Sequence, residues 1–336
     1  MHFSIITCAY NPDVVIFKRV AKAVLSLQVP AKCQAEWLII DNNSNPAIAE
    51  YDWLQAMIEE NSTKSLSVRI IKEEKQGLTA ARLRGYYAAK GDFLILIDDD
   101  NEPSADYLEV LQDLLPRYEF VGAWGPGTIE VDFLAPVSKK YEGHYRGTFQ
   151  EKHLSFTNYA HTESSSSAHP FGTGMVIRKT LMQEYVGQCE KGHYQTTDRI
   201  GNSLASAGDT QMVYSVVKQG FAVGCEPKLA LKHIIPAKRL SYDYMRKMSF
   251  EINFSAVLAD YEMNNAAFTT MQLPKAHYVI RKALSMYIGY LWRRVPLLGM
   301  IYTMGYLGKT IGYYTVKSVK IPYSLRWFLR LLGYRS

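Results

Sequence analysis

The stretch FLILIDDDNEP, residues 93–103, sets five apolar residues directly before three consecutive aspartates. An apolar run of this length that ends in polar residues is typical of a strand buried on both faces of a sheet. Asp98, Asp99 and Asp100 would then lie beyond the carboxyl end of that strand. Three adjacent carboxylates repel one another unless solvent or a cation compensates their charge. Such oxygen ligands suit Mg²⁺ or Mn²⁺, and a solvated turn before a helix is the alternative interpretation.

Similar apolar runs on either side of this strand alternate with segments of helical periodicity. The predicted strands are 3–7, 37–40, 68–71, 93–97 and 120–124. The predicted helices are 14–27, 48–58, 78–89 and 104–115, the last capped by Ser104. Strands that alternate with helices of this length form a mostly parallel sheet with helices on both faces. The sequence therefore predicts an α/β fold whose ligands bind beyond the carboxyl ends of the strands.

The chain after residue 130 is less regular, but it carries further short elements. We predict strands at 175–177, 221–225 and 229–233, helices at 180–185 and 209–218, and a flexible loop at 163–169. No internal repeat is visible in this part of the sequence.

The net charge of +6 over 336 residues is unevenly distributed. From Lys275 to the end there are eleven Lys and Arg and no Asp or Glu, so residues 1–274 carry 27 basic and 32 acidic residues. The basic tail is also rich in Tyr, Trp and Leu, and its longest uncharged run, 295–308, is shorter than the roughly 20 residues that cross a bilayer. We expect helices that lie in the interface of an anionic membrane. Packing of the tail on the body is the main alternative, and nucleic acid is not an expected partner.

Several other classes of protein are disfavoured by the sequence. The four cysteines lie far apart without a CxxC pair, which argues against a zinc ribbon and a thioredoxin-type site. The first residues lack a basic stretch followed by an apolar one, so we expect no secretory signal and a cytoplasmic location at the inner face of the membrane. No GxGxxG follows the first strand, which argues against a dehydrogenase. The loop AYNPD, residues 9–13, lacks the glycine and basic residues of a nucleotidyltransferase.

Four segments, in this order, resemble the donor half of family 2 glycosyltransferases of the GT-A fold, of the bacterial cell-envelope and polysaccharide type. They are SIITCAYNP (4–12), LIIDNNS (38–44), KQGLTAARLRG (75–85) and FLILIDDDNEP (93–103). Three later segments resemble the acceptor and catalytic half: PFGTGMVIRK (170–179), DRIGNSLASAGDTQM (198–212) and LALKHIIPAKRL (229–240). The resemblance implies a GT-A domain over 1–245, with a nucleotide-sugar-binding half at 1–125 and an acceptor half at 126–245. A basic helical region would follow at 246–336.

The resemblance also implies roles in donor binding and metal binding. Along the nucleoside we expect Ala9, Tyr10, Asn11 and Pro12, with Asp41 at the base and Arg82 near the base and diphosphate. Since Arg82 and Arg84 point to opposite sides of their helix, at most one of them faces the sheet edge, and Arg82 as a plain surface cation is the alternative. Asp98 and Asp99 would contact the donor nucleotide, with Asp98 nearer the ribose. Asp100, with Asp98, would bind the metal, a site that His233 could complete unless it is an ordinary core histidine.

The same resemblance makes Asp209 the general base and places Gly172, Thr173, Gly174 and Met175 on the acceptor side. Two residues depart from the family pattern, because Gly208 and Gln211 stand where carboxylates are common. The alternative role of Asp209 is to cap the helix 209–218. Asp198 and Arg199 would position this segment or the acceptor, or form a structural ion pair.

The expected reaction is an inverting, metal-dependent transfer from a nucleotide-diphosphate sugar, UDP-sugar being favoured. The acceptor would be a hydroxyl of a glycan or lipid-linked molecule in cell-surface polysaccharide synthesis. A catalytically degenerate, glycan-binding scaffold is the first alternative, which the departures at Gly208 and Gln211 motivate. A nucleotidyltransferase is the second.

Overall fold

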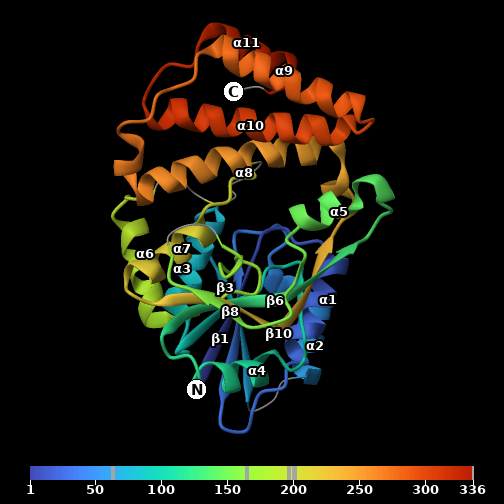
Figure 1. The fold of residues 1–336 in the computed structure, drawn as a ribbon. Coiled ribbons are helices and arrows are strands. Elements are labelled where there is room, and N and C mark those ends of the chain that lie inside the picture. The colour runs from blue at the N-terminus through green and yellow to red at the C-terminus, as the bar shows by residue number, and fades with distance from the viewer. Residues whose placement is uncertain (62–64, 163–165, 195–197, 199–202, 335–336) are drawn as a thin grey trace. The chain divides into compact units, whose positions relative to one another are not determined.

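The computed structural model describes residues 1–61, 65–162, 166–194, 198 and 203–334. The chain folds into two compact units (Figure 1). Unit 1 contains residues 1–134, 144–191 and 209–235, and unit 2 contains residues 135–143, 192–208 and 236–336. The last change from unit 1 to unit 2 falls between residues 235 and 236, whereas the sequence predicts a boundary after residue 245. Residue 245 lies inside helix α8 (Tyr242–Met263).

Unit 1 is built on one mixed, mostly parallel sheet with the strand order β3-β2-β1-β4-β9-β6-β10-β5. Its strands are β1 (His2–Ala9), β2 (Gln34–Asp41), β3 (Leu66–Lys72), β4 (Phe93–Leu96), β5 (Asn101–Pro103), β6 (Val121–Phe133), β9 (Val176–Arg178) and β10 (Ala222–Ile235). Strands β9 and β5 run antiparallel to their neighbours. Two short strands lie off this path: β7 (Lys152–His153) pairs with β6, and β8 (Asn158–Ala160) pairs with β10.

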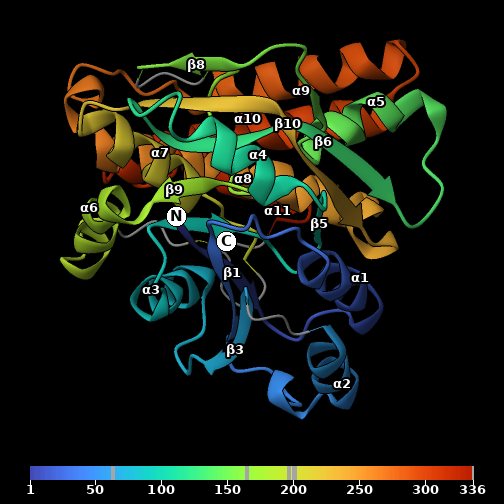
Figure 2. The ribbon, with the colours of Figure 1, turned by 90° about the horizontal axis from the view of Figure 1, so that it is seen from below.

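Helices cover both faces of this sheet because side chains alternate along each strand. Phe3 and Ile5 of β1 share a core cluster with residues of α1 (Val14–Leu25), α2 (Asp52–Asn61) and α4 (Tyr107–Leu114). Ile6 points the other way, against Gly85 of α3 (Leu78–Ala88). Figure 2 shows α3 on one side of β1, and α1 and α2 on the other. Helix α6 (Lys179–Glu190) also belongs to unit 1, whereas α5 (Lys139–Thr148) and α7 (Gly208–Lys218) have their first residues in unit 2 and the rest in unit 1.

The predicted strands and helices of the first 125 residues are present, but two helices begin later than expected. The segment predicted as one helix at 48–58 is a 3₁₀ turn (Ile48–Glu50), the extended residue Tyr51 and then α2. Helix α4 begins at Tyr107 rather than beside Ser104, because residues 101–103 pair with β10 as strand β5. The amide of Ser104 continues this pairing by donating to the carbonyl of Ala230.

The later strands are longer than the sequence predicts. Strand β6 continues to Phe133 through Gly125, Pro126 and Gly127, which indicate a turn in the sequence. The two strands predicted at 221–225 and 229–233 are one strand, β10, with a register shift between Glu226 and Ala230. The loop predicted at 163–169 lies partly outside the described residues, and residues 166–169 are irregular.

Unit 2 consists mainly of α8 (Tyr242–Met263), α9 (Ala276–Trp292), α10 (Pro296–Val316) and α11 (Tyr323–Leu331). Two 3₁₀ turns, Ala237–Leu240 and Asn265–Phe268, flank α8. Helix α10 is central, with α8 on one side and α9 and α11 on the other (Figure 1). Within the described residues, no helix is long and apolar enough to cross a membrane.

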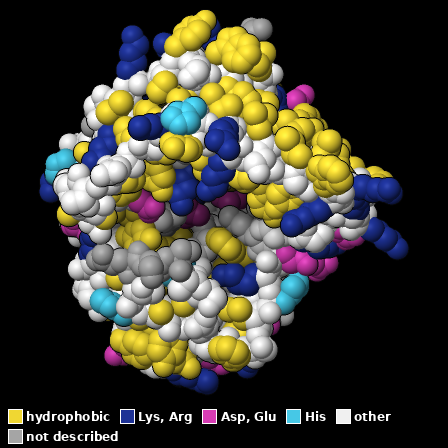
Figure 3. All heavy atoms as spheres, turned by 45° about the horizontal axis from the view of Figure 1, so that its top comes forward, with side chains coloured by type: hydrophobic (Ala, Val, Ile, Leu, Met, Phe, Trp, Pro, Cys, Tyr) yellow, Lys and Arg dark blue, Asp and Glu magenta, His cyan; other side chains and the backbone are white. Residues whose placement is uncertain are grey.

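The contact between α8 and α10 is close because α10 presents glycines to its partner. A Cβ atom built on Gly308 would lie 2.2 Å from the carbonyl oxygen of Phe250, closer than any side chain can approach. Around this contact Phe250, Met304, Leu307 and Ile311 form one apolar cluster with residues of α9 and α11. The outer surface of the unit carries hydrophobic and basic side chains side by side (Figure 3).

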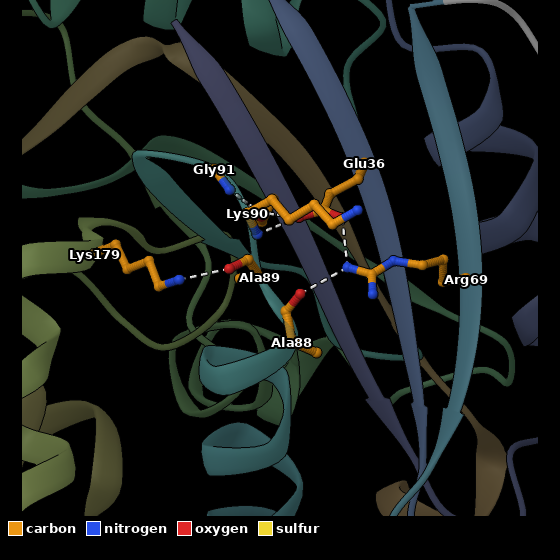
Figure 4. A network of polar contacts seen from close by, with 8 residues as sticks. Glu36, Arg69, Ala88, Ala89, Lys90, Gly91 and Lys179 are labelled. Atoms are coloured by element: carbon orange, nitrogen blue, oxygen red, sulfur yellow. Dashed lines mark hydrogen bonds and ion pairs between the residues drawn. The ribbon is translucent and has the colours of Figure 1, made fainter.

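The amino-terminal edge of the unit 1 sheet is held by one buried carboxylate, that of Glu36 (Figure 4). Its Oε1 accepts hydrogen bonds from the Ser4 hydroxyl (2.6 Å) and the Lys90 amide (2.5 Å), and its Oε2 accepts one from Arg69 (2.6 Å). Arg69 also donates to the carbonyl of Ala88 (2.6 Å). Burial alone would raise the pKa of Glu36, but the hydrogen bonds from Ser4, Lys90 and Arg69 outweigh it and hold the pKa below its ordinary value.

Candidate active site

Strands β1, β2 and β4 end at the same edge of the sheet, where their loops interlock. Asn11, with φ of 45°, receives a hydrogen bond on its side-chain oxygen from the amide of Asn45 (2.8 Å). Its own amide donates to the hydroxyl of Ser44 (3.0 Å). Of the predicted nucleoside-binding residues, Ala9 and Pro12 are buried, whereas Tyr10 and Asn11 are exposed to solvent. The exposed pair is therefore the part of this loop that a ligand can reach.

Asp41, predicted to contact the base, is buried at the end of β2. Its Oδ1 accepts a hydrogen bond from the amide of Ser44 (2.8 Å), and its Oδ2 accepts one from the amide of Ile48 (2.9 Å). The carboxylate thus orders the loop that follows β2.

Asn42, which sequence reasoning missed, extends this order to the next loop. Its side chain donates to the carbonyl of Lys75 (2.7 Å) and accepts from the amide of Gly77 (2.7 Å), directly before α3. The sequence offered a signal, since Asn42 lies in the polar cluster DNNS that ends β2.

Arg82 is the arginine of α3 that faces inward. Its exposed fraction is 6%, whereas Arg84 is exposed, as expected for two residues on opposite sides of a helix. The surface-cation interpretation of Arg82 is therefore wrong. A Cβ atom built on Gly172 would lie 3.3 Å from Nη2 of Arg82, so the guanidinium reaches the loop before β9.

The three aspartates after β4 are partly exposed, and Asn101 organises their turn. The fully buried side chain of Asn101 accepts a hydrogen bond from the amide of Asp98 (3.1 Å) and donates to Oδ1 of Asp100 (2.8 Å). The amide of Ile234 in β10 donates to the carbonyl of Asp100 (2.8 Å). Asn101 was missed in the sequence, because its register opposite His233 in β10 is a long-range contact.

His233 is buried in β10, and its two ring nitrogens face different groups. Nδ1 lies 2.9 Å from the carbonyl oxygen of Phe149, and Nε2 lies 3.5 Å from Oδ2 of Asp100. A carbonyl oxygen can only accept, so Nδ1 carries a proton and Nε2 is the ring nitrogen that faces the carboxylate. A backbone carbonyl behind a histidine is the arrangement that orients metal-binding histidines.

A divalent cation fits this pair of acceptors, since imidazole nitrogen and carboxylate oxygen are both ligands of Mn²⁺. Among the described residues, no group of three or more His, Cys, Asp and Glu side chains is arranged to hold an ion. Two protein ligands agree with the way Mg²⁺ is usually held, by one or two carboxylates together with water and substrate phosphates.

The segment from Gly172 to Met175 lies next to the end of β4. The amide of Gly174 donates to the carbonyl of Leu96 (2.9 Å), and the hydroxyl of Tyr107 donates to the carbonyl of Gly174 (2.6 Å). The hydroxyl of Thr173 donates to the side chain of Gln150 (2.7 Å). Since Met175 is fully buried, its side chain supports this segment from inside rather than facing solvent.

Asp209 occupies the first turn of α7 and is partly exposed. Its Oδ2 accepts a hydrogen bond from the amide of Gly172 (3.2 Å), and its Oδ1 accepts one from the amide of Thr210 (2.9 Å). A Cβ atom on Gly172 would lie 3.2 Å from Cβ of Asp209, so Gly172 touches both Asp209 and Arg82. Helix α7 begins at Gly208, one residue before Asp209, which does not fit the capping interpretation of Asp209.

These contacts form a continuous path through the candidate site. Asp100 faces His233, His233 is bound by Phe149, and the next residue, Gln150, is bound by Thr173. Thr173 follows Gly172, which contacts Asp209 and Arg82. Sequence reasoning missed Phe149 and Gln150, since no local pattern indicates a contact 84 residues along the chain.

The sequence itself matches one family model. The model of glycosyl transferase family 2 matches residues 4–186, which is more than half of the chain. The chain belongs to this family. It is therefore a glycosyltransferase that moves a sugar from a nucleotide sugar, which confirms the predicted enzyme class. No curated protein matches it.

Solved structures resemble this family 2 glycosyltransferase in fold only. GalNAc-T7 with UDP, GalNAc and Mn²⁺ has a TM-score of 0.50 and 14% identity, over 78% of this chain and 51% of that one. TarS 1-349 from S. aureus has a TM-score of 0.46 and 13% identity, over 96% and 93%. The mannosyltransferase PcManGT from Pyrobaculum calidifontis has a TM-score of 0.49 and 11% identity, over 98% and 79%. The mostly parallel sheet with flanking helices is the predicted GT-A fold.

The glycosyltransferase departs from the expected family pattern on either side of Asp209. Asp198 holds the segment before Asp209, because its Oδ1 accepts hydrogen bonds from the amides of Ala207 (2.9 Å) and Gly208 (2.8 Å). Asp198 thus caps the start of α7, while Arg199 lies outside the described residues. The side chain of Gln211, which stands where the family pattern has a carboxylate, is buried. A carboxylate at this position would therefore be buried as well.

Proposed function

We propose that this protein is an inverting, divalent-metal-dependent glycosyltransferase that uses a nucleotide-diphosphate sugar, with a UDP-sugar favoured. The observation that carries the proposal is the path of contacts from Asp100 through His233, Phe149, Gln150 and Thr173 to Gly172 and Asp209. This path joins a carboxylate–imidazole pair suited to a metal with a partly exposed carboxylate suited to a base. Such a reaction needs both groups close to one substrate.

The donor would lie along the carboxyl edge of the sheet. The exposed residues Tyr10 and Asn11 form one wall, and the loop ordered by Asp41 forms its neighbour. Asp41 then acts on the base through that loop, because its buried carboxylate already holds the loop by two backbone hydrogen bonds. The inward-facing guanidinium of Arg82 suits the diphosphate, since a planar fork of donors matches phosphate oxygens.

Asp100 and His233 would hold the metal, with Asp98 and Asp99 toward the ribose. When bound, Mn²⁺ or Mg²⁺ supplies positive charge to the diphosphate as it leaves. The carbonyl of Phe149 accepts a hydrogen bond from Nδ1–H of His233 and so keeps Nε2 directed at the site. Asn101 keeps Asp100 in place through its own hydrogen bond.

Asp209 would take the proton of the acceptor hydroxyl. The amides of Gly172 and Thr210 each bind one of its oxygens, and each oxygen keeps a further lone pair for that proton. A single base that acts opposite the leaving group gives one displacement, with inversion at the anomeric carbon. NMR of the product tests this stereochemistry, because retained configuration would refute a single displacement.

The acceptor would be a glycan or lipid-linked hydroxyl used in cell-surface polysaccharide synthesis, at the cytoplasmic face of the membrane. Gly172 and Thr173 line its approach to Asp209 in this proposal, while Gly174 and Met175 support them. The basic and aromatic region 275–336 supports a location at an anionic membrane surface.

A thermal-shift panel of nucleoside diphosphates, with and without Mn²⁺, tests the proposed function. The UDP and Mn²⁺ present in the GalNAc-T7 structure make that pair the first to try. A ligand that binds only the native state raises Tm by mass action. We expect a rise with one nucleotide that needs the metal and is lost in Asp100→Asn. No rise with any nucleotide would overturn the proposal and favour a degenerate, glycan-binding scaffold.

A further inference from the structure

Unit 2 exposes several large apolar side chains on two of its helices, α9 and α11. Helix α9 buries Val279 and Ala283, and its opposite side exposes Leu284, Ile288, Leu291 and Trp292. Trp292 is 84% exposed. These four positions are spaced by four, three and one residues, which places them on one stripe of the helix.

Helix α11 repeats the pattern in a shorter form. It buries Leu325, Phe328 and Leu329 and exposes Tyr323, Trp327 and Leu331, which follow one another at intervals of four. The exposed fractions of Tyr323 and Trp327 are 72% and 53%. Both helices bury their inner sides in the same cluster around α10, so their apolar outer sides both belong to the surface of the unit.

Positive charge surrounds these stripes. Residues 275–336 contain eleven Lys and Arg, and the last acidic residue of the chain is Glu262. Several of these cations are exposed on or beside the two helices, namely Lys275, Arg281, Lys282, Arg293, Arg294, Lys320 and Arg330. Figure 3 shows dark-blue side chains beside yellow ones over this part of the molecule.

From these observations we infer that the outer faces of α9 and α11 form one docking face that inserts into the interface of an anionic lipid bilayer. The apolar side chains enter the boundary between headgroups and acyl chains, and the Lys and Arg side chains contact the lipid phosphates. Trp and Tyr suit this depth because each has an apolar ring and one polar atom. At 17 and 9 residues, the two helices suit an in-plane position rather than a span.

The charge of the face argues against its most obvious competitor, a second copy of the same chain. A twofold dimer would bring the same patch of both copies together. The cations of the two copies would then face one another and repel, because residues 275–336 contain no Asp or Glu to pair with them. A bilayer with anionic lipids supplies the missing negative charge and covers the apolar stripes together.

The inference rests on the proposed function in one respect: the benefit of membrane binding would be to keep the enzyme beside a membrane-linked acceptor. Its evidence lies entirely on the surface of unit 2, so it can fail independently. Binding to vesicles and binding of UDP with Mn²⁺ are therefore measured on the same protein samples.

The test is co-sedimentation of the full chain with vesicles of phosphatidylcholine alone or mixed with phosphatidylglycerol. We expect binding to the mixed vesicles that weakens as salt is added, with a blue shift of tryptophan fluorescence. The triple variant Ile288→Ser, Trp292→Ser, Trp327→Ser should lose binding by about tenfold or more, because exposed apolar side chains supply the insertion. The charge variant Arg281→Gln, Arg293→Gln, Arg330→Gln should lose the preference for phosphatidylglycerol.

The matched control replaces three exposed apolar residues of unit 1: Val15→Ser, Leu134→Ser and Phe156→Ser. It should bind vesicles like the unaltered chain, and all variants should keep the UDP-dependent thermal shift. Equal vesicle binding by the Ile288, Trp292 and Trp327 variant and the unaltered chain would overturn the inference. So would light scattering that shows a dimer which this variant converts to a monomer without a change in vesicle binding.

Discussion

The backbone amide of Gly172 donates a hydrogen bond of 3.2 Å to Oδ2 of Asp209. This bond connects the loop before β9 with the first turn of α7, two segments that are 37 residues apart in the sequence. It fixes the direction of the carboxylate at the point where Arg82 also approaches. The position of the proposed base therefore depends on a loop that itself carries no charge.

Asp209→Asn should abolish most of the turnover while leaving the donor site intact. An amide cannot take the proton of the acceptor hydroxyl, and general-base catalysis contributes about 10²- to 10⁴-fold. We expect kcat to fall by about this factor, with the UDP-dependent thermal shift unchanged. Asp113→Asn, an exposed change on α4, is the matched control and should have full activity. Full activity of Asp209→Asn would assign the base elsewhere.

Gly172→Ala should impair the reaction without unfolding the protein. The new Cβ would lie 3.2 Å from Cβ of Asp209 and 3.3 Å from Nη2 of Arg82, so both side chains must shift by a few tenths of an ångström. Because small misplacements of catalytic groups are costly, we expect kcat to fall by about tenfold or more with a nearly unchanged Tm. Gly187→Ala on α6, where a Cβ meets nothing within 4 Å, should leave kcat unchanged. Unchanged kcat in Gly172→Ala would separate this loop from catalysis.

His233→Ala should weaken the response to metal. If the Nε2 lone pair binds the ion with Asp100, its loss should raise the Mn²⁺ concentration needed for the UDP-dependent thermal shift by about 10- to 100-fold. The control is His153→Ala, because that side chain is 59% exposed. A metal titration that is the same in His233→Ala and the unaltered chain would make His233 an ordinary core residue.

Gly308→Ala should destabilise unit 2. Its Cβ would meet the backbone oxygen of Phe250, which cannot move without separating α8 from α10. Overpacking of a core costs about 1–3 kcal/mol, and a contact with backbone belongs at the upper end. Gly289→Ala on the exposed side of α9 should instead stabilise the helix by about 0.8 kcal/mol. Urea unfolding of both variants measures the difference, and equal midpoints would show that the two helices can separate without cost.

Glu36→Gln should lower the free energy of unfolding at neutral pH by about 1.5–3 kcal/mol, because the hydrogen bonds from Ser4, Lys90 and Arg69 lose their charged acceptor. The native pKa of Glu36 is lowered from 4.5, so on acidification the unfolded chain takes up its proton first. The stabilisation is thus complete above pH 4.5 and is lost as the pH falls below it toward the native pKa. We expect the difference between the two proteins to shrink in acid, whereas Glu59→Gln, an exposed change, should show no such trend.

Much of unit 1 could be predicted because its signals are local. Alternating apolar runs locate β1 to β4, and the polar residues at their ends indicate the ligand edge of the sheet. The opposite directions of Arg82 and Arg84 also follow from helix geometry alone, and the structure confirms them. The start of α4 was predicted incorrectly because pairing between β5 and β10 overrides the local preference of Ser104.

The interior of the candidate site could not be predicted in the same way. Phe149 acts through its backbone carbonyl, which no residue type encodes, and Asn101 acts through a register set by β10. Asp198 caps α7 from nine residues before Ala207, a distance at which no capping pattern is visible in the sequence. The sequence thus indicates the charged residues, together with Gly172 and Asp198 near the proposed base, but it does not indicate Phe149 and Asn101, which orient His233 and Asp100.

The buried carboxylate of Glu36 has a consequence for engineering. It fastens β1, β2 and the segment before β4 at one edge of the sheet, while the loops that we propose bind the donor leave from the other. Among the residues of these loops, Tyr10 is exposed, whereas Asn11 and Ser44 hold the loops together by hydrogen bonds, so substitutions at Tyr10 carry the least risk to folding. If the proposed donor site is right, Tyr10 is therefore the first position at which to select variants that use a different nucleotide sugar.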